Sequence, residues 1–230
     1  MSDQPVVSVR GEATIEVDPE LAVLTISVES QDIDRDTTVD LLSKRARAVT
    51  DVVARFKSGI ERSETSRLQV YPEFENKKKG ESVRRYVGRA TTHLTMHDFA
   101  LLSDLIVALA AIEMVSIDGP WWRLRPDSEV YRMARLAAAE DALVRARDYA
   151  GAFGAEIATL VEIADQGMST RYDRPLAASA RFAASSSWEG QGDERRFDLE
   201  PQRQEVVGNI EARFQLTRAT LSPTLRPDSP

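Results

Sequence analysis

Residues 6–30, VVSVRGEATIEVDPELAVLTISVES, hold two alternating apolar runs on either side of a short polar segment. In the first run the apolar side chains share one parity: Val7, Val9, Ala13, Ile15 and Val17. The second run alternates in the same way: Leu24, Ile26 and Val28. Alternation with period two is typical of strands that bury one face. Asp18-Pro19-Glu20 has the composition of a turn, so the sequence predicts an antiparallel hairpin over these residues.

The chain then alternates between helical and strand-like patterns. Apolar residues at helical spacing predict a helix over 34–57, and alternation predicts strands over 65–74 and 83–97. Asp98 is a suitable N-cap for a second helix, and a short strand is predicted over 113–119.

A third and longer helix is predicted to start at Asp127 or Ser128 and to run to about Phe153. Its predicted buried stripe consists of the larger apolar residues and two alanines: Met133, Leu136, Leu143, Ala146, Ala150 and Phe153. Strands are predicted over 157–164 and 206–216, the second from strict alternation.

These elements predict an α+β fold, with a mainly antiparallel sheet built from hairpins and three helices packed on it. One domain is expected over 6–217, with disordered termini at 1–5 and 218–230. Residues 167–203 lack periodicity and are rich in Ser, Arg, Gly and Asp, so we expect a mobile loop there within the domain.

Composition restricts the classes of function. The 230 residues carry a formal net charge of -7, which disfavours sequence-independent binding to nucleic acid. The absence of cysteine excludes disulfides, thiolate nucleophiles and cysteine-ligated zinc. The opening MSDQPVVS lacks the features of a signal peptide, and no apolar run is long enough for a membrane helix. We therefore expect a cytoplasmic protein without membrane insertion.

Few residues are candidates for chemistry. His93 and His97 lie on one predicted strand, about 13 Å apart at strand spacing, so they cannot share a metal ion. Trp121 and Trp122 are adjacent, so on a strand their side chains point to opposite faces. We expect Trp122 to be the structural one, and Trp121, with Tyr71 as a further candidate, to be the more exposed contact for a subunit or a ligand. The residues suggest no catalytic, cofactor-binding or metal site.

Several motifs resemble the SIMPL domain family in order and spacing. The opening V-x-G-x-A at residues 9–13 is followed by V-D-P and then E-L-A. Thr65 to Pro72 resembles the family's T-x-x-L-x-V-x-P strand. Further matching segments include the Ala-rich helix over 134–154, Pro175 to Ala184, and Leu199-Glu200-Pro201 with the final strand. The resemblance covers about residues 6–217.

The resemblance implies an oligomeric bacterial protein linked to the cell envelope and to stress, from a family without agreed catalytic residues. Our first interpretation is therefore a non-enzymatic homo-oligomer that acts as a scaffold or adaptor. The alternative is a small-ligand-binding module with a cleft near Trp121 and Trp122. A closed cavity with convergent polar groups would favour the ligand-binding module, and a large apolar subunit contact would favour assembly.

Overall fold

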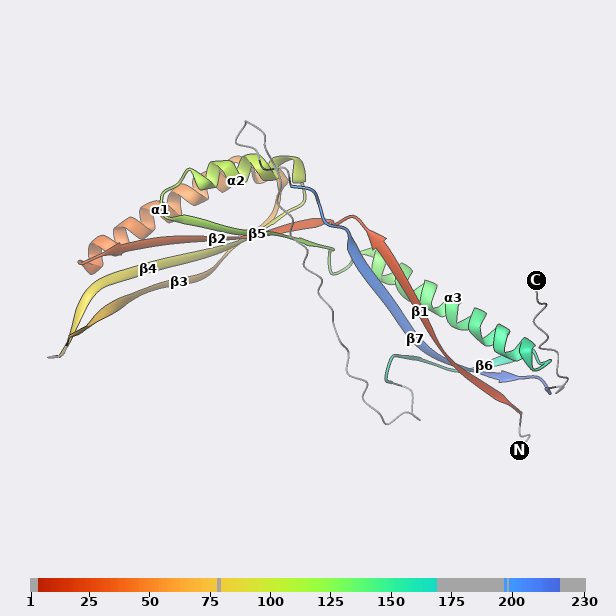
Figure 1. The fold of residues 1–230 in the computed structure, drawn as a ribbon. Coiled ribbons are helices and arrows are strands. Elements are labelled where there is room, and N and C mark those ends of the chain that lie inside the picture. Colours follow the sequence, from red (N-terminus) through yellow and green to blue (C-terminus); the bar gives the residue numbers. More distant parts are fainter. Residues whose placement is uncertain (1–3, 78–79, 169–196, 198, 220–230) are drawn as a thin grey trace, which may run out of the picture. The chain divides into compact units, whose positions relative to one another are not determined.

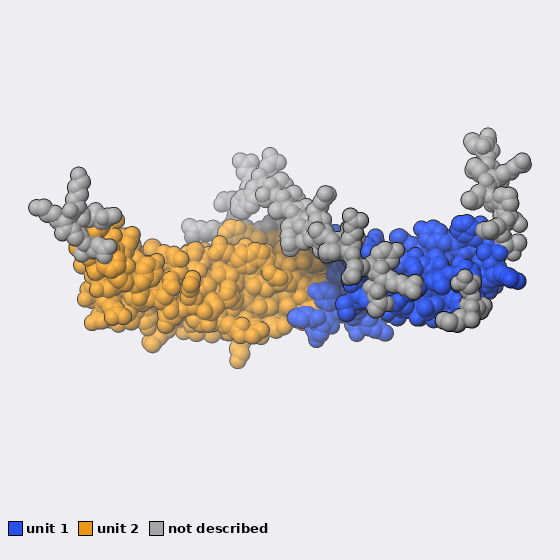
Figure 2. Space-filling model, turned by 90° about the horizontal axis from the view of Figure 1, so that it is seen from below, with its two compact units in different colours: residues 1–17, 126–188, 205–230 blue, residues 18–125, 189–204 orange. Residues whose placement is uncertain are grey.

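The computed structural model describes residues 4–77, 80–168, 197 and 199–219. The greater part of the loop predicted at 167–203 lies outside the described residues, as do most of the two predicted disordered termini. The sequence predicted one domain, and the chain forms two compact units, coloured separately in Figure 2. Unit 1 combines residues 1–17, 126–188 and 205–230, and unit 2 combines residues 18–125 and 189–204.

Unit 2 is a four-stranded antiparallel sheet with helices on one face (Figure 1). The strand order is β3-β4-β2-β5. These strands are β2 (Leu21–Asp32), β3 (Ile60–Lys77), β4 (Gly80–Met96) and β5 (Val115–Arg123). The helices are α1 (Arg35–Arg55) and α2 (Leu102–Ala110). The short 3-10 turn η1 (Lys57–Gly59) follows α1, and a second 3-10 turn, η2 (Phe99–Leu101), precedes α2. Asp98 caps η2 by accepting a hydrogen bond from the Ala100 N–H at 3.0 Å.

The core of unit 2 lies between the sheet and the two helices. Alternate residues of the two central strands are fully buried, among them Leu24, Ile26, Leu94 and Met96. Trp122 points into the same layer, where its ring meets Phe99 edge-on with centroids 4.9 Å apart. Trp121 points to the other face of the sheet and is 44% exposed, as the strand parity predicted.

Unit 1 is a smaller antiparallel sheet with one long helix. The strand order is β1-β7-β6, which makes β1 and β6 the two edges. The elements are β1 (Val6–Val17), α3 (Glu129–Ala152), β6 (Ile157–Asp165) and β7 (Gln204–Leu216). The Leu216 N–H donates to the Pro5 carbonyl at 2.8 Å, so β7 runs back beside β1 from the far end of the sequence.

Small residues set the contact between α3 and this sheet. The buried row of α3 is made of alanines four residues apart: Ala134, Ala138, Ala142, Ala146 and Ala150. Glycines face this row from the strands. A Cβ atom at Gly11 would lie 1.9 Å from the Ala138 carbonyl oxygen, and one at Gly208 would lie 2.1 Å from the Ala134 carbonyl oxygen. The helix backbone therefore rests almost directly on the backbone of β1 and β7.

The predicted hairpin over residues 6–30 is wrong, although both of its strands exist. β1 pairs with β7, whereas β2 lies between β4 and β5 in the other sheet. Residues 18–20 connect the two sheets. They are held by the segment after β5, because the Glu20 N–H donates to the Arg123 carbonyl and Glu20 Oε2 accepts from the Arg125 N–H. Alternation showed that each strand buries one face, but it carried no information about the partner strand.

The predicted stripe of α3 is wrong for three of its large side chains, because Met133, Leu136 and Phe153 are all more than half exposed. Leu143 is half-buried against the core of unit 1, and Ala146 and Ala150 are buried as predicted. The rest of the buried row consists of Ala134, Ala138 and Ala142. Close helix–sheet contact at the two glycines leaves no room for larger side chains on the buried face. The predicted α+β class is confirmed, because the described residues form three α-helices and two antiparallel sheets.

Replacing Gly11 should destabilise unit 1 more than its size suggests. In Gly11→Ala the new methyl group would meet a helix carbonyl that is fixed by its own backbone, so α3 must move away from β1. We expect a loss of about 2 kcal/mol or more in the free energy of unfolding, as for overpacked cores. Urea denaturation followed by circular dichroism measures this loss.

Gly151→Ala is the matched control. Gly151 lies on α3, the helix that Gly11 contacts, and a Cβ atom at Gly151 would have nothing within 4 Å. This variant should be neutral or stabilised by up to about 1 kcal/mol, because alanine favours helix more than glycine does. Equal losses in the two variants would contradict the close contact described here.

The tryptophan pair gives a second prediction on stability. Trp122→Ala removes a ring that packs on Phe99 and the core of unit 2, and we expect a loss of about 3 kcal/mol. Trp121→Ala removes an exposed ring and should change stability by less than about 0.5 kcal/mol. Thermal melts of both variants test this order, and the reverse order would show that the strand faces are misassigned.

Candidate functional site

The β6 edge of unit 1 exposes apolar side chains on the face that carries α3. Leu160 is paired with Phe214, and Ile163 with Ala212, so each pair points to the same face of the sheet. Phe214 and Ala212 are buried under the alanines of α3. Leu160 and Ile163 are 52% and 57% exposed, so the helix leaves this part of β6 uncovered, although Ile157 at the start of the strand packs against the buried cluster that includes Ala150.

At the opposite edge, α3 extends beyond β1. The Glu12 N–H donates to Asp141 Oδ2 at 2.9 Å. Odd residues of β1 direct their backbone groups toward β7, as Pro5 does, so the Glu12 N–H points away from the sheet. This N–H and, to a smaller extent, Arg145 at 2.8 Å hold the pKa of Asp141 below its ordinary value. A side chain of α3 therefore lies outside the β1 edge.

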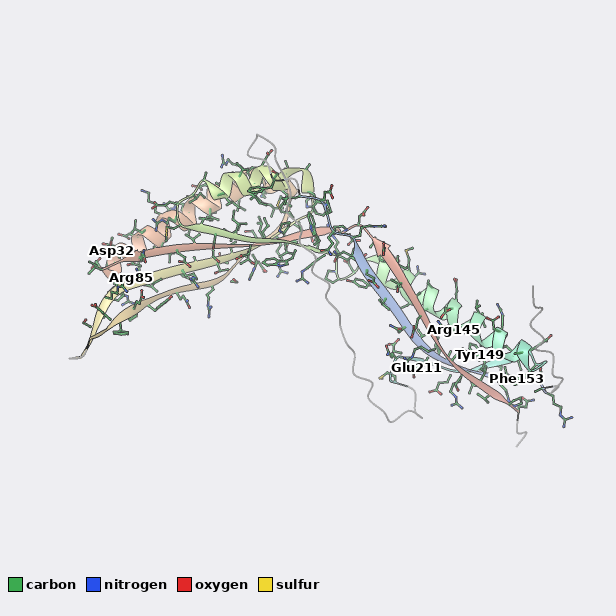
Figure 3. All side chains as sticks on the ribbon, viewed as in Figure 1. Asp32, Arg85, Arg145, Tyr149, Phe153 and Glu211 are labelled. Carbon is green, nitrogen blue, oxygen red and sulfur yellow. The ribbon has the colours of Figure 1, made fainter. Side chains whose placement is uncertain are left out.

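Asp141 belongs to a row of α3 residues that runs parallel to the buried alanine row. The row, spaced four residues apart and ending at the C-cap, is Met133, Ala137, Asp141, Arg145, Tyr149 and Phe153. Figure 3 labels Arg145, Tyr149 and Phe153 along the helix. Tyr149 and Phe153 are 54% and 56% exposed. This row, in which Asp141 and Arg145 stand between the apolar residues, thus lies on the β1 side of the helix, while apolar residues are uncovered at the other edge of the sheet.

The outward face of the same sheet is mainly polar, with Val207 as an exposed apolar side chain. Arg10 of β1 pairs with Glu211 of β7 at 3.2 Å, and Arg213 of β7 pairs with Glu162 of β6 at 3.1 Å. Such half-exposed pairs contribute little to stability, but they keep this face solvated. The apolar surface of unit 1 is therefore concentrated on the helix side of the sheet and at its two edges.

Unit 2 presents an open sheet face on the side away from its helices. Trp121 and Tyr71, two of the residues singled out from the sequence, both lie on this face and are 44% and 40% exposed. Trp121 is the cross-strand partner of Val23. Tyr71 pairs with Val87, which in turn pairs with Gln31 of β2. Eight residues of strand separate these positions, a distance of about 27 Å. The structure does not bring Trp121 and Tyr71 together, and Trp122 lies on the opposite face.

The same open face carries a polar row across four strands. Asp118, Thr25, His93 and Glu64 are successive cross-strand neighbours. His93 Nδ1 and Thr25 Oγ1 are 3.1 Å apart, which is hydrogen-bond distance. Glu64 is paired with Arg62 at 2.6 Å. The row is solvent-exposed, so these groups lack the enclosed surroundings that would tune a nucleophile or a base.

Two ion pairs continue this face toward the end of the β3–β4 hairpin. Arg89 pairs with Glu29, and Arg85 pairs with Glu73. The hydrogen bond from Arg85 lowers the pKa of the Glu73 carboxyl. The alternation of charge across neighbouring strands is that of a solvated sheet surface.

A hollow of about 440 Å³ lies at the start of α3, between Pro126 and Arg135. Its lining has two carboxylates and two guanidinium groups, and Arg132 pairs with Glu129 at 3.6 Å. This balance of charge selects no class of ligand. Within the described ranges, no three His, Asp or Glu side chains are placed to hold a metal ion.

The sequence placed the candidate contact at the tryptophans and missed the two edges of unit 1. The signal was present in the alanines, which recur every fourth residue from 134 to 150. Reading them as the buried row would have left Met133, Tyr149 and Phe153 outside it. Nothing in the sequence indicated that Leu160 and Ile163 would be exposed, because their exposure depends on where α3 lies across the sheet.

Comparison with curated proteins and with a solved structure gives no relative that bears on the fold or function of this chain. No curated protein matches the chain. Among solved structures, a hydantoinase/carbamoylase family amidase from Burkholderia ambifaria has 17% identity and a TM-score of 0.31. The match covers 54% of this chain and 34% of the amidase, so the chain spans about a third of that enzyme, and the likeness is too low to bear on fold or function. None of the helices in the described residues combines the length and apolar character that crossing a bilayer needs.

The family model described as "SIMPL: Protein of unknown function (DUF541)" matches residues 7–214. The match includes every strand and helix described above except the first residue of β1 and the last two of β7. It agrees with the order of motifs seen in the sequence, from the V-x-G-x-A opening to the final strand. The chain is a member of the SIMPL family.

Proposed function

We propose that this protein is a non-enzymatic scaffold or adaptor that works as a homo-oligomer. The observation that carries the proposal is the apolar surface of unit 1, where large side chains of α3 and β6 are more than half exposed beside two open sheet edges. Uncapped edges and apolar patches of this kind are where chains associate. Pairing between copies would cover both features at once.

The polar face of unit 2 supports a role in presentation more than in catalysis. Its Thr25–His93 pair is open to solvent, and the neighbouring Glu64 is already paired with Arg62. A sheet face of this kind, displayed several times in an oligomer, offers a broad polar surface to a partner. The alternative, a ligand-binding module, depends on Trp121 alone, because Trp122 is packed on the other side of the sheet.

Light scattering after gel filtration at micromolar concentration tests the assembly. We expect a mass that is a multiple of the 25.6 kDa chain. The mass should change little between 0.1 and about 0.5 M salt, since apolar contacts are not screened as surface ion pairs are. A sharp monomer peak at all concentrations would contradict the proposed function.

A further inference from the structure

At each edge of unit 1 an apolar surface lacks a covering element, and each edge offers the element that the other lacks. At β1, the row of α3 that contains Tyr149 and Phe153 overhangs the strand and covers nothing beyond it. At β6, Leu160 and Ile163 point to the helix side of the sheet but have no helix above them. One edge therefore has helix surface without a strand, and the other has a strand without helix surface.

We propose that β6 of one copy pairs with β1 of the next copy, so that α3 of the second copy covers Leu160 and Ile163 of the first. The inference rests on the proposed function and names the surface through which copies associate. It joins two different edges, so the contact is heterologous and repeats from copy to copy. A rotation that closes would give a ring, and one that does not close would give a filament.

Strand direction is compatible with this pairing. β1 and β6 each run antiparallel to β7, so they are parallel to each other within one copy. Copies related by rotation, with their helices on the same face, would then pair β6 and β1 as parallel strands. Asp141 accepts a hydrogen bond from one of the outward groups of β1, the Glu12 N–H. The outward residues on either side, Arg10 and Thr14, face no other strand of this sheet.

The two symmetric alternatives each leave a deficit. Pairing β1 with β1 would bring two overhanging helices together and leave Leu160 and Ile163 exposed. Pairing β6 with β6 would leave Tyr149 and Phe153 exposed.

Two double variants separate the edges. Leu160→Lys/Ile163→Lys disables the β6 edge, and Tyr149→Lys/Phe153→Lys disables the overhang at β1. All four residues are more than half exposed, so the monomer should still fold. We expect each double variant alone to elute as a monomer. An equimolar mixture should give a dimer with one chain of each kind and nothing larger, because each chain keeps one intact edge.

The control is Leu136→Lys/Val144→Lys. These side chains are 51% and 52% exposed, and helical periodicity places them about half a turn from the alanine row. This variant should assemble as the unaltered chain does. Analytical ultracentrifugation at several concentrations gives the mass of every sample, including the unaltered protein.

The outcomes distinguish the two proposals. If the unaltered chain is a monomer, both the proposed function and this interface fail. An oligomeric unaltered chain with edge variants of the same mass would leave self-assembly standing and overturn the β6–β1 contact. Monomeric variants that form no dimer on mixing would also overturn it, because the intact β1 edge of one variant and the intact β6 edge of the other should pair. A contact between two like edges would instead leave one of the two double variants assembled on its own.

Discussion

The contact between α3 and the glycines of β1 and β7 is the constraint on which unit 1 depends. Gly11 and Gly208 let the helix backbone approach until a single methyl group would collide with a carbonyl oxygen. Only alanine fits on the helix side of that contact, and the larger apolar residues are placed on the remaining faces of α3. The helix also lies toward β1, as the bond between Asp141 and Glu12 shows. The exposed apolar surface follows from both facts, since a helix that rests on β1 and β7 leaves Leu160 and Ile163 of β6 uncovered.

Among the residues that the structure describes, unit 2 buries its core between a sheet and two helices, without the close contact between helix and strand backbones seen in unit 1. Two helices with apolar buried faces, leucine-rich in α2, cover one side of a four-stranded sheet, and β2 and β4 bury alternate side chains beneath them. Trp122 completes this core through Phe99, while the register of β2 against β5 sends Trp121 to the open side. That open side carries hydroxyls and ion pairs together with the exposed rings of Trp121 and Tyr71. Unit 2 also exposes Leu68 on its edge strand β3, whereas the exposed apolar residues of unit 1 lie on both α3 and β6.

Much of this fold could be predicted from local pattern. The strands, the helices, the cap at Asp98, the outward Trp121 and the α+β class all follow from periodicity and capping chemistry in one stretch of chain. Partners could not be predicted in the same way. β1 lies beside β7, about 200 residues away in sequence, and nothing in 6–17 identifies that strand over β2. The buried row of α3 could be predicted only at Ala146 and Ala150, because burial along the rest of the row depends on the close approach at the glycines and not on hydrophobic size. The candidate edges were missed for the same reason, since both are consequences of where that helix lies.

Hydrogen–deuterium exchange as a function of protein concentration tests the central claim most directly. The claim is that the margins left by α3 are where copies meet. It predicts that amides of 6–17 and 157–165 become protected together as concentration rises, while the edge strands β3 and β5 of unit 2 keep their exchange rates. Concentration-dependent protection confined to β3 or β5 would contradict the claim, and so would a stable oligomer in which β1 and β6 exchange as fast as in the dilute chain.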